Sequence, residues 1–301
     1  MGRVEDKRRV LREGLEGTGA LTTVGAHDAM SAQLIEQYGF DAVWVSGFGV
    51  ATMTHAIPDL NLVTMSEALA AAVRIDGATS LPVVADCDNG FGGLSNVVRT
   101  VREYERAGIA GICIEDNLFP KRNSLLDSSV MRELLPIDEQ AIRIGAGKSA
   151  QDDKSFVLIA RVEALIAGHG VDEACKRADA YVDAGADAIL IHSRDKSLGE
   201  IREFLERWDG VGSVPLVAVP TLFPSFTSEQ LASMGFRMVI FANQPMRAAI
   251  GAMEETLRVL AERRKADAVD PHIANLDHVF DLVGTRATID EESRARSRAL
   301  R

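Results

Sequence analysis

The sequence contains few cysteines, no long apolar run and no excess of positive charge. Its cysteines, Cys87, Cys113 and Cys175, show no CxxC spacing, so we interpret them as reduced thiols rather than as disulfide partners or zinc ligands. No apolar run approaches the roughly 20 residues that span a bilayer, and no apolar core follows the charged start MGRVEDKRRV. The net charge of −11 disfavours nucleic acid and anionic membranes as partners. We therefore expect a soluble, cytoplasmic protein without a secretory signal.

A short pattern recurs at four places along the 301 residues. Each copy has an amphipathic helix, then a glycine, then an apolar run that begins about three residues later; the glycines are Gly39, Gly108, Gly185 and Gly235. Glycine past a helix end takes the left-handed conformation that stops the helix. An apolar run of this kind predicts a strand that is buried on both faces of a parallel sheet.

Further short apolar runs lie between these copies, at Ala20–Ala26, Val83–Asp86, Phe156–Val162 and Leu216–Pro220. Together they make eight candidate strands. The patterns Thr64-x-x-Glu67 and Thr227-x-x-Gln230 predict capping boxes at two of the intervening helices. Strand and helix alternating eight times predicts an α/β fold, a (β/α)₈ barrel. A doubly wound open sheet is the alternative, but no GxGxxG follows the first strand.

The chain continues beyond the eighth predicted strand. Met246–Lys265 predicts a long amphipathic helix, Asn275–Thr288 predicts a second helix, and Ile289–Arg301 predicts a solvated charged tail. An extra helix past the eighth unit has no place on its own barrel. We therefore interpret residues 1–301 as a single barrel domain in which residues 245–301 pack on a partner subunit.

Polar residues collect where the predicted strands end. Asp86 and Asp88 follow a short apolar run and, two residues apart, project from the same side of a strand. Two such charges repel unless a cation lies between them, and Mg²⁺ prefers oxygen ligands. Because barrel active sites lie at the C-terminal ends of strands, Glu115 of the next strand adds a third candidate ligand, and Arg161 offers a two-pronged donor for a carboxylate or phosphate. The alternatives are solvated turn acids and, for Arg161, an internal ion pair with Glu115 or Glu163.

Nine segments carry a family resemblance, in family order, over roughly residues 20 to 260. They are GAHDAMSA (25–32), WVSGFGV (44–50), PDLN (58–61), VVADCDNGFG (83–92), IEDNLFPKRNS (114–124), IARVEALIAG (159–168), DAGADAILIHS (183–193), VPT (219–221) and FAN (241–243). With them the sequence resembles the phosphoenolpyruvate mutase/isocitrate lyase superfamily and, within it, the phosphoenolpyruvate mutases. The resemblance implies an isomerase of phosphonate biosynthesis that interconverts phosphoenolpyruvate and 3-phosphonopyruvate.

The resemblance also implies an assembly and a cofactor. The assembly is a homotetramer, a dimer of dimers, in which the eighth barrel helix is swapped between subunits. The cofactor is Mg²⁺, bound through Asp86, with Asp88 and Glu115 acting mostly through bound water.

The substrate contacts follow from the same resemblance. Ser46, Gly47 and Phe48 are expected to hold the carboxylate and carbonyl end of the substrate. Arg161 and His192 are expected to bind its anionic groups.

The resemblance further implies a nucleophile and a gating loop. Asp59, in the segment PDLN, matches the proposed nucleophile of the family, which would carry the phosphoryl group. Lys121, Arg122, Asn123 and Ser124 match the loop that closes over the substrate, with Lys121 and Asn123 taking part in catalysis.

The sequence of the gating loop also distinguishes between a mutase, a hydrolase and a lyase. Lyases of the superfamily that break C–C bonds carry K-[KR]-C-G-H there, and this chain has Asn123 and Ser124 in place of the cysteine and glycine. Phosphonopyruvate hydrolases resemble the mutases but carry threonine where this chain has Asn123. We therefore predict a mutase, with a hydrolase second, a lyase or decarboxylase of a related 2-oxo acid third, and a non-catalytic binding protein last. The chain departs from the family pattern at Cys87 and Asn89, and at the stretch with His55 that precedes Asp59.

Overall fold

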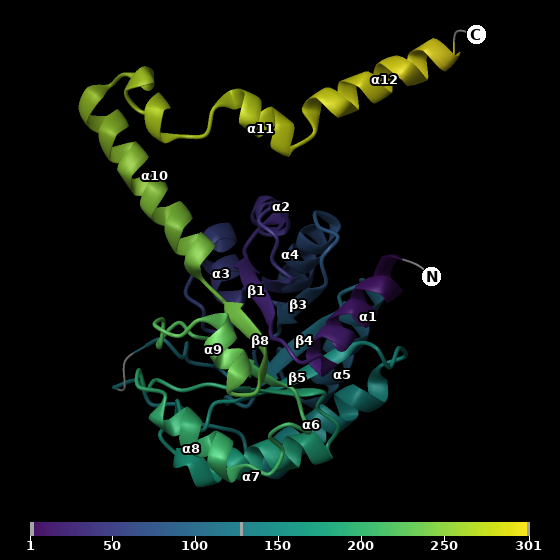
Figure 1. Cartoon of the computed structure of the whole chain (residues 1–301), viewed down its shortest axis with the longest axis vertical. Coiled ribbons are helices and arrows are strands. Elements are labelled where there is room, and N and C mark those ends of the chain that lie inside the picture. The colour runs from purple at the N-terminus through teal and green to yellow at the C-terminus, as the bar shows by residue number, and fades with distance from the viewer. Residues whose placement is uncertain (1–2, 127–128, 300–301) are drawn as a thin grey trace. The chain divides into compact units, whose positions relative to one another are not determined.

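A closed barrel of eight parallel strands forms the centre of the structure, a computed structural model that describes residues 3–126 and 129–299 (Figure 1). Neighbouring strands pair in sequence order, and β1 pairs with β8 to close the barrel. The (β/α)₈ prediction is confirmed, and the open doubly wound sheet is excluded. The strands are β1 (Leu21–Ala26), β2 (Ala42–Val45), β3 (Val83–Asp86), β4 (Gly111–Glu115), β5 (Val157–Val162), β6 (Ala188–Ile191), β7 (Leu216–Ala218) and β8 (Phe236–Phe241).

Helices surround the barrel on its outer side (Figure 1). The four repeated glycines all adopt the left-handed conformation that the sequence predicts, with φ between 77° and 107°. Both predicted capping boxes are present, at Thr64 and Thr227. These helices are α2 (Ala29–Gln37), α3 (Gly47–His55), α4 (Met65–Gly77), α5 (Leu94–Arg106), α6 (Ile137–Ala150), α7 (Gly170–Asp183), α8 (Gly199–Arg207) and α9 (Ser228–Ser233).

A helix that the sequence did not reveal, α1 (Arg3–Glu16), precedes the first strand. Its Leu11 and Leu15 are buried in the same apolar cluster as the inward-facing side chains of the barrel. Arg8 lies over the ring of Phe156, with 5.5 Å between its guanidinium carbon and the ring centroid. The many charges of this segment hide its few apolar positions, which is why its role in the core could not be predicted.

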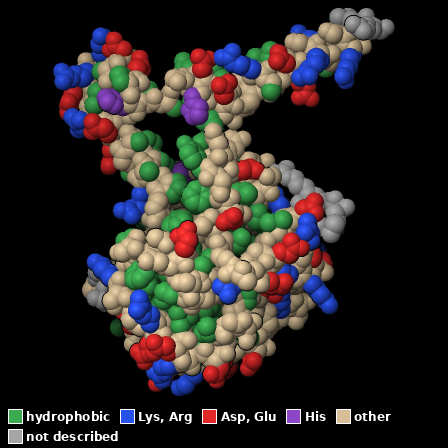
Figure 2. Space-filling model, in the orientation of Figure 1, with side chains coloured by type: hydrophobic (Ala, Val, Ile, Leu, Met, Phe, Trp, Pro, Cys, Tyr) green, Lys and Arg blue, Asp and Glu red, His purple; other side chains and the backbone are tan. Residues whose placement is uncertain are grey.

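The chain divides into two compact units, Met1–Met246 and Arg247–Arg301. The second unit contains most of α10 (Gln244–Arg263), followed by two short 3₁₀ helices, Ala266–Ala268 and Asp270–His272, and by α11 (Leu276–Leu282) and α12 (Thr285–Ala299). Charged side chains of both signs lie along its surface (Figure 2). Among the described residues, no helix is long and apolar enough to cross a membrane.

The end of the chain differs from the prediction. The helix expected over Asn275–Thr288 is broken at Gly284, whose φ of +67° ends α11. The tail expected over Ile289–Arg301 is helical as far as Ala299. Ion pairs one turn apart, such as Arg296 with Glu292, support a helix that is exposed on all sides.

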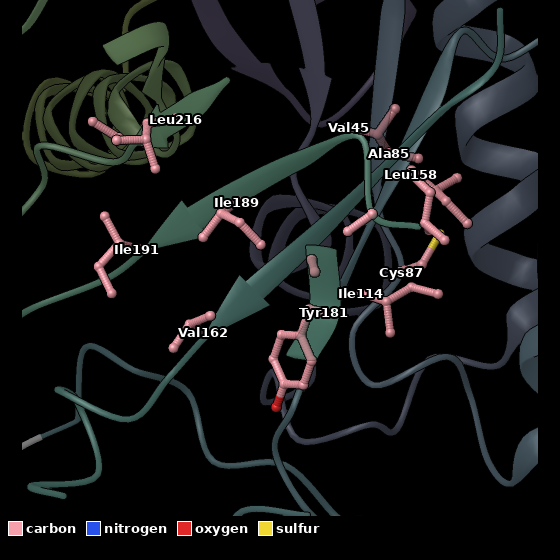
Figure 3. Packing of buried hydrophobic residues seen from close by; sticks show 14 of the residues in the cluster. Val45, Ala85, Cys87, Ile114, Leu158, Val162, Tyr181, Ile189, Ile191 and Leu216 are labelled. Atoms are coloured by element: carbon pink, nitrogen blue, oxygen red, sulfur yellow. The ribbon is translucent and has the colours of Figure 1, made fainter. Parts of the chain in front are cut away.

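Two apolar layers hold the barrel unit together. Outward-facing strand residues such as Val45, Ala85, Leu158 and Ile189 pack against the helices (Figure 3). Inward-facing residues fill the barrel itself. Burial of so many aliphatic side chains supplies the main driving force for folding, at about 25 cal/mol per Å² of apolar surface.

Side chains along each strand alternate between inward and outward positions. At the C-terminal end of the barrel the inward positions change from apolar to polar. The inward residues Val84, Cys113, Ile159 and Leu190 belong to the buried inner cluster. The next inward position, two residues later, is polar in every one of these strands. These positions are Asp86, Glu115, Arg161 and His192, and they place four predicted site residues on one rim.

Candidate active site

One cavity of about 60 Å³ opens at the C-terminal ends of the strands. Ten of the predicted site residues line it: Ser46, Phe48, Asp59, Asp86, Glu115, Lys121, Asn123, Ser124, Arg161 and His192. The other two, Gly47 and Asp88, line a smaller neighbouring cavity of about 20 Å³, which also has Asp59 and Asp86 in its wall. The structure therefore brings the whole predicted set together, from five strand ends and two loops.

The ammonium group of Lys121 lies between two carboxylates. Its Nζ forms an ion pair with Asp59 Oδ1 at 2.8 Å and a second, shorter one with Asp88. All three side chains are less than 10% exposed. Burial lowers the pKa of Lys121, but Asp88 and Asp59 outweigh that effect and hold the pKa well above its usual value. The loop therefore carries a fixed positive charge into an acidic site.

Asn123 holds the other oxygen of the same aspartate. Its Nδ2 donates to Asp59 Oδ2 at 2.7 Å. The carboxylate of Asp59 is thus contacted on each oxygen by a different residue of the gating loop, 121–124. In this conformation the loop forms part of the cavity wall, and the side chain of Asp59 is only 9% exposed.

Arg161 is the centre of a second polar cluster. Its Nη2 donates to Ser124 Oγ at 2.7 Å, its Nη1 lies 3.3 Å from Glu115 Oε2, and its Nε contacts Glu163. The internal ion pairs that the sequence offered as the alternative are therefore present, with both Glu115 and Glu163, and the role of Arg161 as a substrate clamp stays a prediction. Burial alone acts to raise the pKa of Glu163, but Arg161 and then His192 outweigh it, so that the pKa is held below its usual range.

The imidazole of His192 lies in a setting that disfavours its protonated form. Burial and the neighbouring Arg161 both lower its pKa. Its Nδ1 lies 2.9 Å from Arg161 Nη2 and 3.0 Å from Glu163 Oε1, while its buried Nε2 has no hydrogen-bond partner among the described residues. If Nδ1 accepts from Arg161, Nε2 carries the proton and can donate to a ligand.

The N-terminus of α3 borders the acidic side of the site. Ser46 caps the helix, and its Oγ accepts from Gly49 N at 3.0 Å. A Cβ at Gly47 would lie 3.4 Å from the carboxylates of Asp86 and Asp88, so the start of the helix lies beside both acids. The free N–H groups and the dipole of this helix end favour negative charge.

Burial leaves two of the carboxylates poorly solvated. It raises the pKa of Glu115 to about 8, although Arg161 opposes the shift. It raises the pKa of Asp88 to about 6 against the effect of Lys121. In their ionised form both groups therefore need a further positive charge.

The acids fit a cation that takes few protein ligands. Within residues 3–126 and 129–299, no three His, Cys, Asp or Glu side chains converge so that they alone could hold a metal ion. However, Asp86 forms no ion pair with any described side chain, and the buried Oε1 of Glu115 has no hydrogen-bond partner there. Mg²⁺ usually takes one or two carboxylates and completes its shell with water and substrate oxygens. The roles of Asp86, Asp88 and Glu115 in metal binding remain predictions.

Several cavity residues were not predicted. Trp44, Leu125, Val219 and Ala242 line the cavity as apolar side chains, and apolar residues in a strand or loop give no chemical signal. Three of them could have been found by counting inward positions, because they lie on strands or strand ends. Thr221 and Asn243 also line the cavity; they end the segments VPT and FAN, to which no role was assigned from the sequence.

Comparison with known proteins finds similar mutases, hydrolases and lyases. A family model described as phosphoenolpyruvate phosphomutase matches residues 11–261. Phosphonopyruvate hydrolase of Variovorax sp. (strain Pal2) is 41% identical over 290 residues, which are 96% of this chain and 97% of that protein. 2-Methylisocitrate lyases match at lower identity, 34–37%.

Solved structures give the same result. A crystal structure of phosphoenolpyruvate phosphomutase from Streptomyces platensis subsp. rosaceus has a TM-score of 0.91 at 41% identity, with 95% of this chain and 98% of that chain covered. Phosphonopyruvate hydrolase in complex with oxalate and Mg++ has a TM-score of 0.88 at 39% identity, with 96% and 98% covered. Mutase and hydrolase are therefore similar to this chain to nearly the same degree.

Proposed function

Because the chain belongs to the phosphoenolpyruvate mutase/isocitrate lyase superfamily, we propose that it interconverts phosphoenolpyruvate and 3-phosphonopyruvate with the help of Mg²⁺. One observation carries this proposal: Asn123 and Lys121 together hold both oxygens of Asp59 under a closed loop. An isomerisation through a phosphorylated aspartate requires that water be kept from that aspartate. The missing cysteine in the loop argues against lyase chemistry.

The proposed chemistry has two steps. A carboxylate oxygen of Asp59 first attacks phosphorus; the bond from phosphorus to the enol oxygen of phosphoenolpyruvate breaks, and an aspartyl phosphate and the enolate of pyruvate result. The C3 carbon of that enolate then attacks the same phosphorus, the aspartyl bond breaks, and 3-phosphonopyruvate leaves a free carboxylate behind. No proton is gained or lost over the cycle.

The residues of the site take on separate tasks in this scheme. Arg161 and the Nε2–H of His192 bind the phosphoryl oxygens, whose charge is spread over the transition state. Asn123 and Ser124 close the loop over the substrate, and the Ser46 hydroxyl with the N–H groups of Gly47 and Phe48 faces its carboxylate. Lys121 keeps Asp59 in place and offsets the charge that accumulates beside Asp88.

A divalent cation fits the acidic side of the site, at Asp86 with Asp88 and Glu115. When bound, Mg²⁺ would neutralise the carboxylate and enolate oxygens of the pyruvate unit and so make the enolate a better leaving group. The complex of the related hydrolase with oxalate and Mg++ supports this assignment, since oxalate has the shape and charge of such an enolate.

Hydrolysis of phosphonopyruvate to pyruvate and phosphate is the second candidate. The 41% identity to the Variovorax hydrolase over nearly the whole of both chains favours it. The two activities differ in whether water reaches the phosphorylated aspartate, so they can share all the acidic and cationic residues described above.

Phosphorus NMR of the reaction mixture separates the two. Phosphonopyruvate is added to the protein with MgCl₂, and the signals of phosphoenolpyruvate and free phosphate are followed. We expect phosphoenolpyruvate as the main product and no turnover after treatment with EDTA. Asp59→Asn serves as the inactive control and should still bind oxalate with Mg²⁺. Stoichiometric release of free phosphate by the unaltered protein would replace the mutase with the hydrolase.

The assembly is also part of the proposal. We propose a homotetramer in which residues 245–301 pack on a partner subunit and the eighth barrel helix is exchanged. Among the described residues, α11 and α12 bury no side chain, and Leu276, Val279 and Phe280 remain exposed. Apolar helical surface of this kind favours a partner.

A further inference from the structure

Asn61 connects the gating loop to the acidic centre of the site. Its Oδ1 accepts the backbone N–H of Lys121 at 2.6 Å, and its Nδ2 donates to Asp88 Oδ2 at 3.0 Å. It lies two residues after Asp59 in the same loop. One amide therefore contacts both the backbone of Lys121 and the carboxylate that the side chain of Lys121 also contacts.

The backbone of Asn61 is held in an unusual conformation. Its φ is +59°, in the left-handed region that asparagine and glycine tolerate and most other residues avoid. The turn aims the side chain back toward the strand ends instead of toward solvent. The conformation therefore serves the two hydrogen bonds.

A second buried amide supports the first. Asn89, which is 1% exposed, forms longer reciprocal contacts with Asn61, 3.3 Å and 3.4 Å between amide nitrogen and oxygen. Its Nδ2 also lies 3.4 Å from the carbonyl oxygen of Asn117, just before the gating loop. The pair of amides links the loop of Asp59, the end of β3 and both ends of the segment 117–121.

We propose that Asn61 is a positioning residue that couples closure of the gating loop to the placement of Asp59. This inference rests on the proposed function of the site. When the loop closes, the Lys121 amide reaches Asn61 and the Lys121 ammonium reaches Asp59 and Asp88 at the same time. Loss of the Asn61 side chain leaves the ammonium as the sole attachment of Lys121 in this network, so the loop stays open longer and water reaches the aspartyl phosphate.

Asn61→Gly tests the proposal, because glycine keeps the left-handed backbone and removes only the side chain. Hydrogen–deuterium exchange of the peptide that spans residues 120–125 is measured in the presence of oxalate and Mg²⁺. We expect exchange of these amides to be about tenfold faster than in the unaltered protein, as for the loss of one hydrogen bond. In turnover with phosphonopyruvate, kcat should fall and the fraction of free phosphate should rise, while KM changes less.

Asn96→Ala is the matched control. Asn96 is exposed in α5, lies outside both cavities and, like Asn61, accepts a backbone N–H, that of Gly93 at 3.1 Å. Its variant should match the unaltered protein in exchange and in product ratio. Asn89→Ala is the second variant if Asn61→Gly folds poorly, and it should show the same changes to a smaller extent.

The outcomes separate the proposal from the proposed function. Wild-type exchange rates in Asn61→Gly and Asn89→Ala, with both folded, overturn the coupling whatever the activity. If the unaltered protein forms neither phosphoenolpyruvate nor phosphate, the proposed function fails, and faster exchange in Asn61→Gly would still support the attachment of the loop. A lower melting temperature with an unchanged product ratio and unchanged exchange would reduce Asn61 to a purely structural role.

Discussion

Each carboxylate oxygen of Asp59 is contacted by a different side chain: Lys121 contacts Oδ1, and Asn123 contacts Oδ2. A cation and a neutral amide affect that group differently. The ammonium offsets charge, whereas the amide fixes the rotation of the carboxylate and covers the oxygen that it contacts. Replacing the amide of Asn123 should therefore affect the access of water to Asp59 more than it affects the affinity for the anionic substrate.

Asn123→Thr should raise the ratio of free phosphate to isomerised product by about tenfold. Threonine is too short to make the 2.7 Å contact to Asp59 Oδ2, and a hydrogen bond to a charged group contributes about 1.5–3 kcal/mol. The ratio is measured by phosphorus NMR. Leu126→Thr places the same residue just after the loop, at a position outside the cavity, and should leave the ratio unchanged. A ratio unchanged in Asn123→Thr would exclude this residue as the determinant of product choice.

The residue pattern predicted the charged groups at the strand ends, the family resemblance added Asp59 and Lys121, and most of the apolar lining was missed. Asp86, Glu115, Arg161 and His192 stood out as polar groups after apolar runs. Trp44 did not, because a tryptophan within an apolar strand looks like any core residue. Hydrogen-bond partners could not be predicted either, since they depend on the side-chain rotations that packing fixes.

At the scale of elements, a buried network ties β4 to α7 beneath the gating loop. Asp116, which directly follows β4, accepts from Arg177 Nη1 at 3.0 Å, from Tyr181 Oη at 2.8 Å and from the backbone of Glu163 at 3.0 Å. Its side chain is fully buried, and burial raises its pKa against the effect of Arg177. The network anchors the segment from which the gating loop begins.

Arg177→Met should lower the free energy of unfolding by about 3–5 kcal/mol, because it leaves a buried carboxylate without its cation. Chemical denaturation followed by circular dichroism measures the change. Arg207→Met on α8 is the control: the ion pairs that Arg207 forms with the described residues are exposed, so its loss should have little effect. A similar, small effect for both variants would show that Asp116 is solvated or protonated in the folded protein.

The sequence predicts elements best where a helix end, a glycine and an apolar run coincide. The strands at Gly108 and Gly185 are of this kind, and the structure has them. α1 lacked such a signal, and most of α12 was missed because its charged surface looks like that of a solvated tail. The pattern of apolar residues predicts an element through the side chains that the element buries. It fails to predict an element that buries few of them.

At the scale of the whole molecule, the C-terminal unit raises the question of assembly. α10 is 20 residues long, and the only one of its residues that is buried is Met246. Leu257 in its middle is 64% exposed. A long helix with an exposed apolar residue at its centre is consistent with the tetramer that we propose.

Light scattering after gel filtration should give about four times the chain mass of 32.5 kDa for the unaltered protein. Leu257→Glu should shift the protein to a smaller species, because a charge cannot be buried in an apolar interface without a large cost. Ile142→Glu on α6, at a similarly exposed position (59%), should leave the mass unchanged. A monomer in the unaltered protein, or an unchanged mass for Leu257→Glu, would contradict the proposed packing of residues 245–301.

The four-residue loop 121–124 has a consequence for how such enzymes diversify. The acids and cations at the strand ends occupy inward positions of the barrel strands. A shift of a strand by one residue would turn these side chains outward and replace them with residues that now pack against the helices. The loop is under no such constraint. New reactions can therefore arise by substitutions in a short loop while the barrel and the charged residues at its strand ends stay the same.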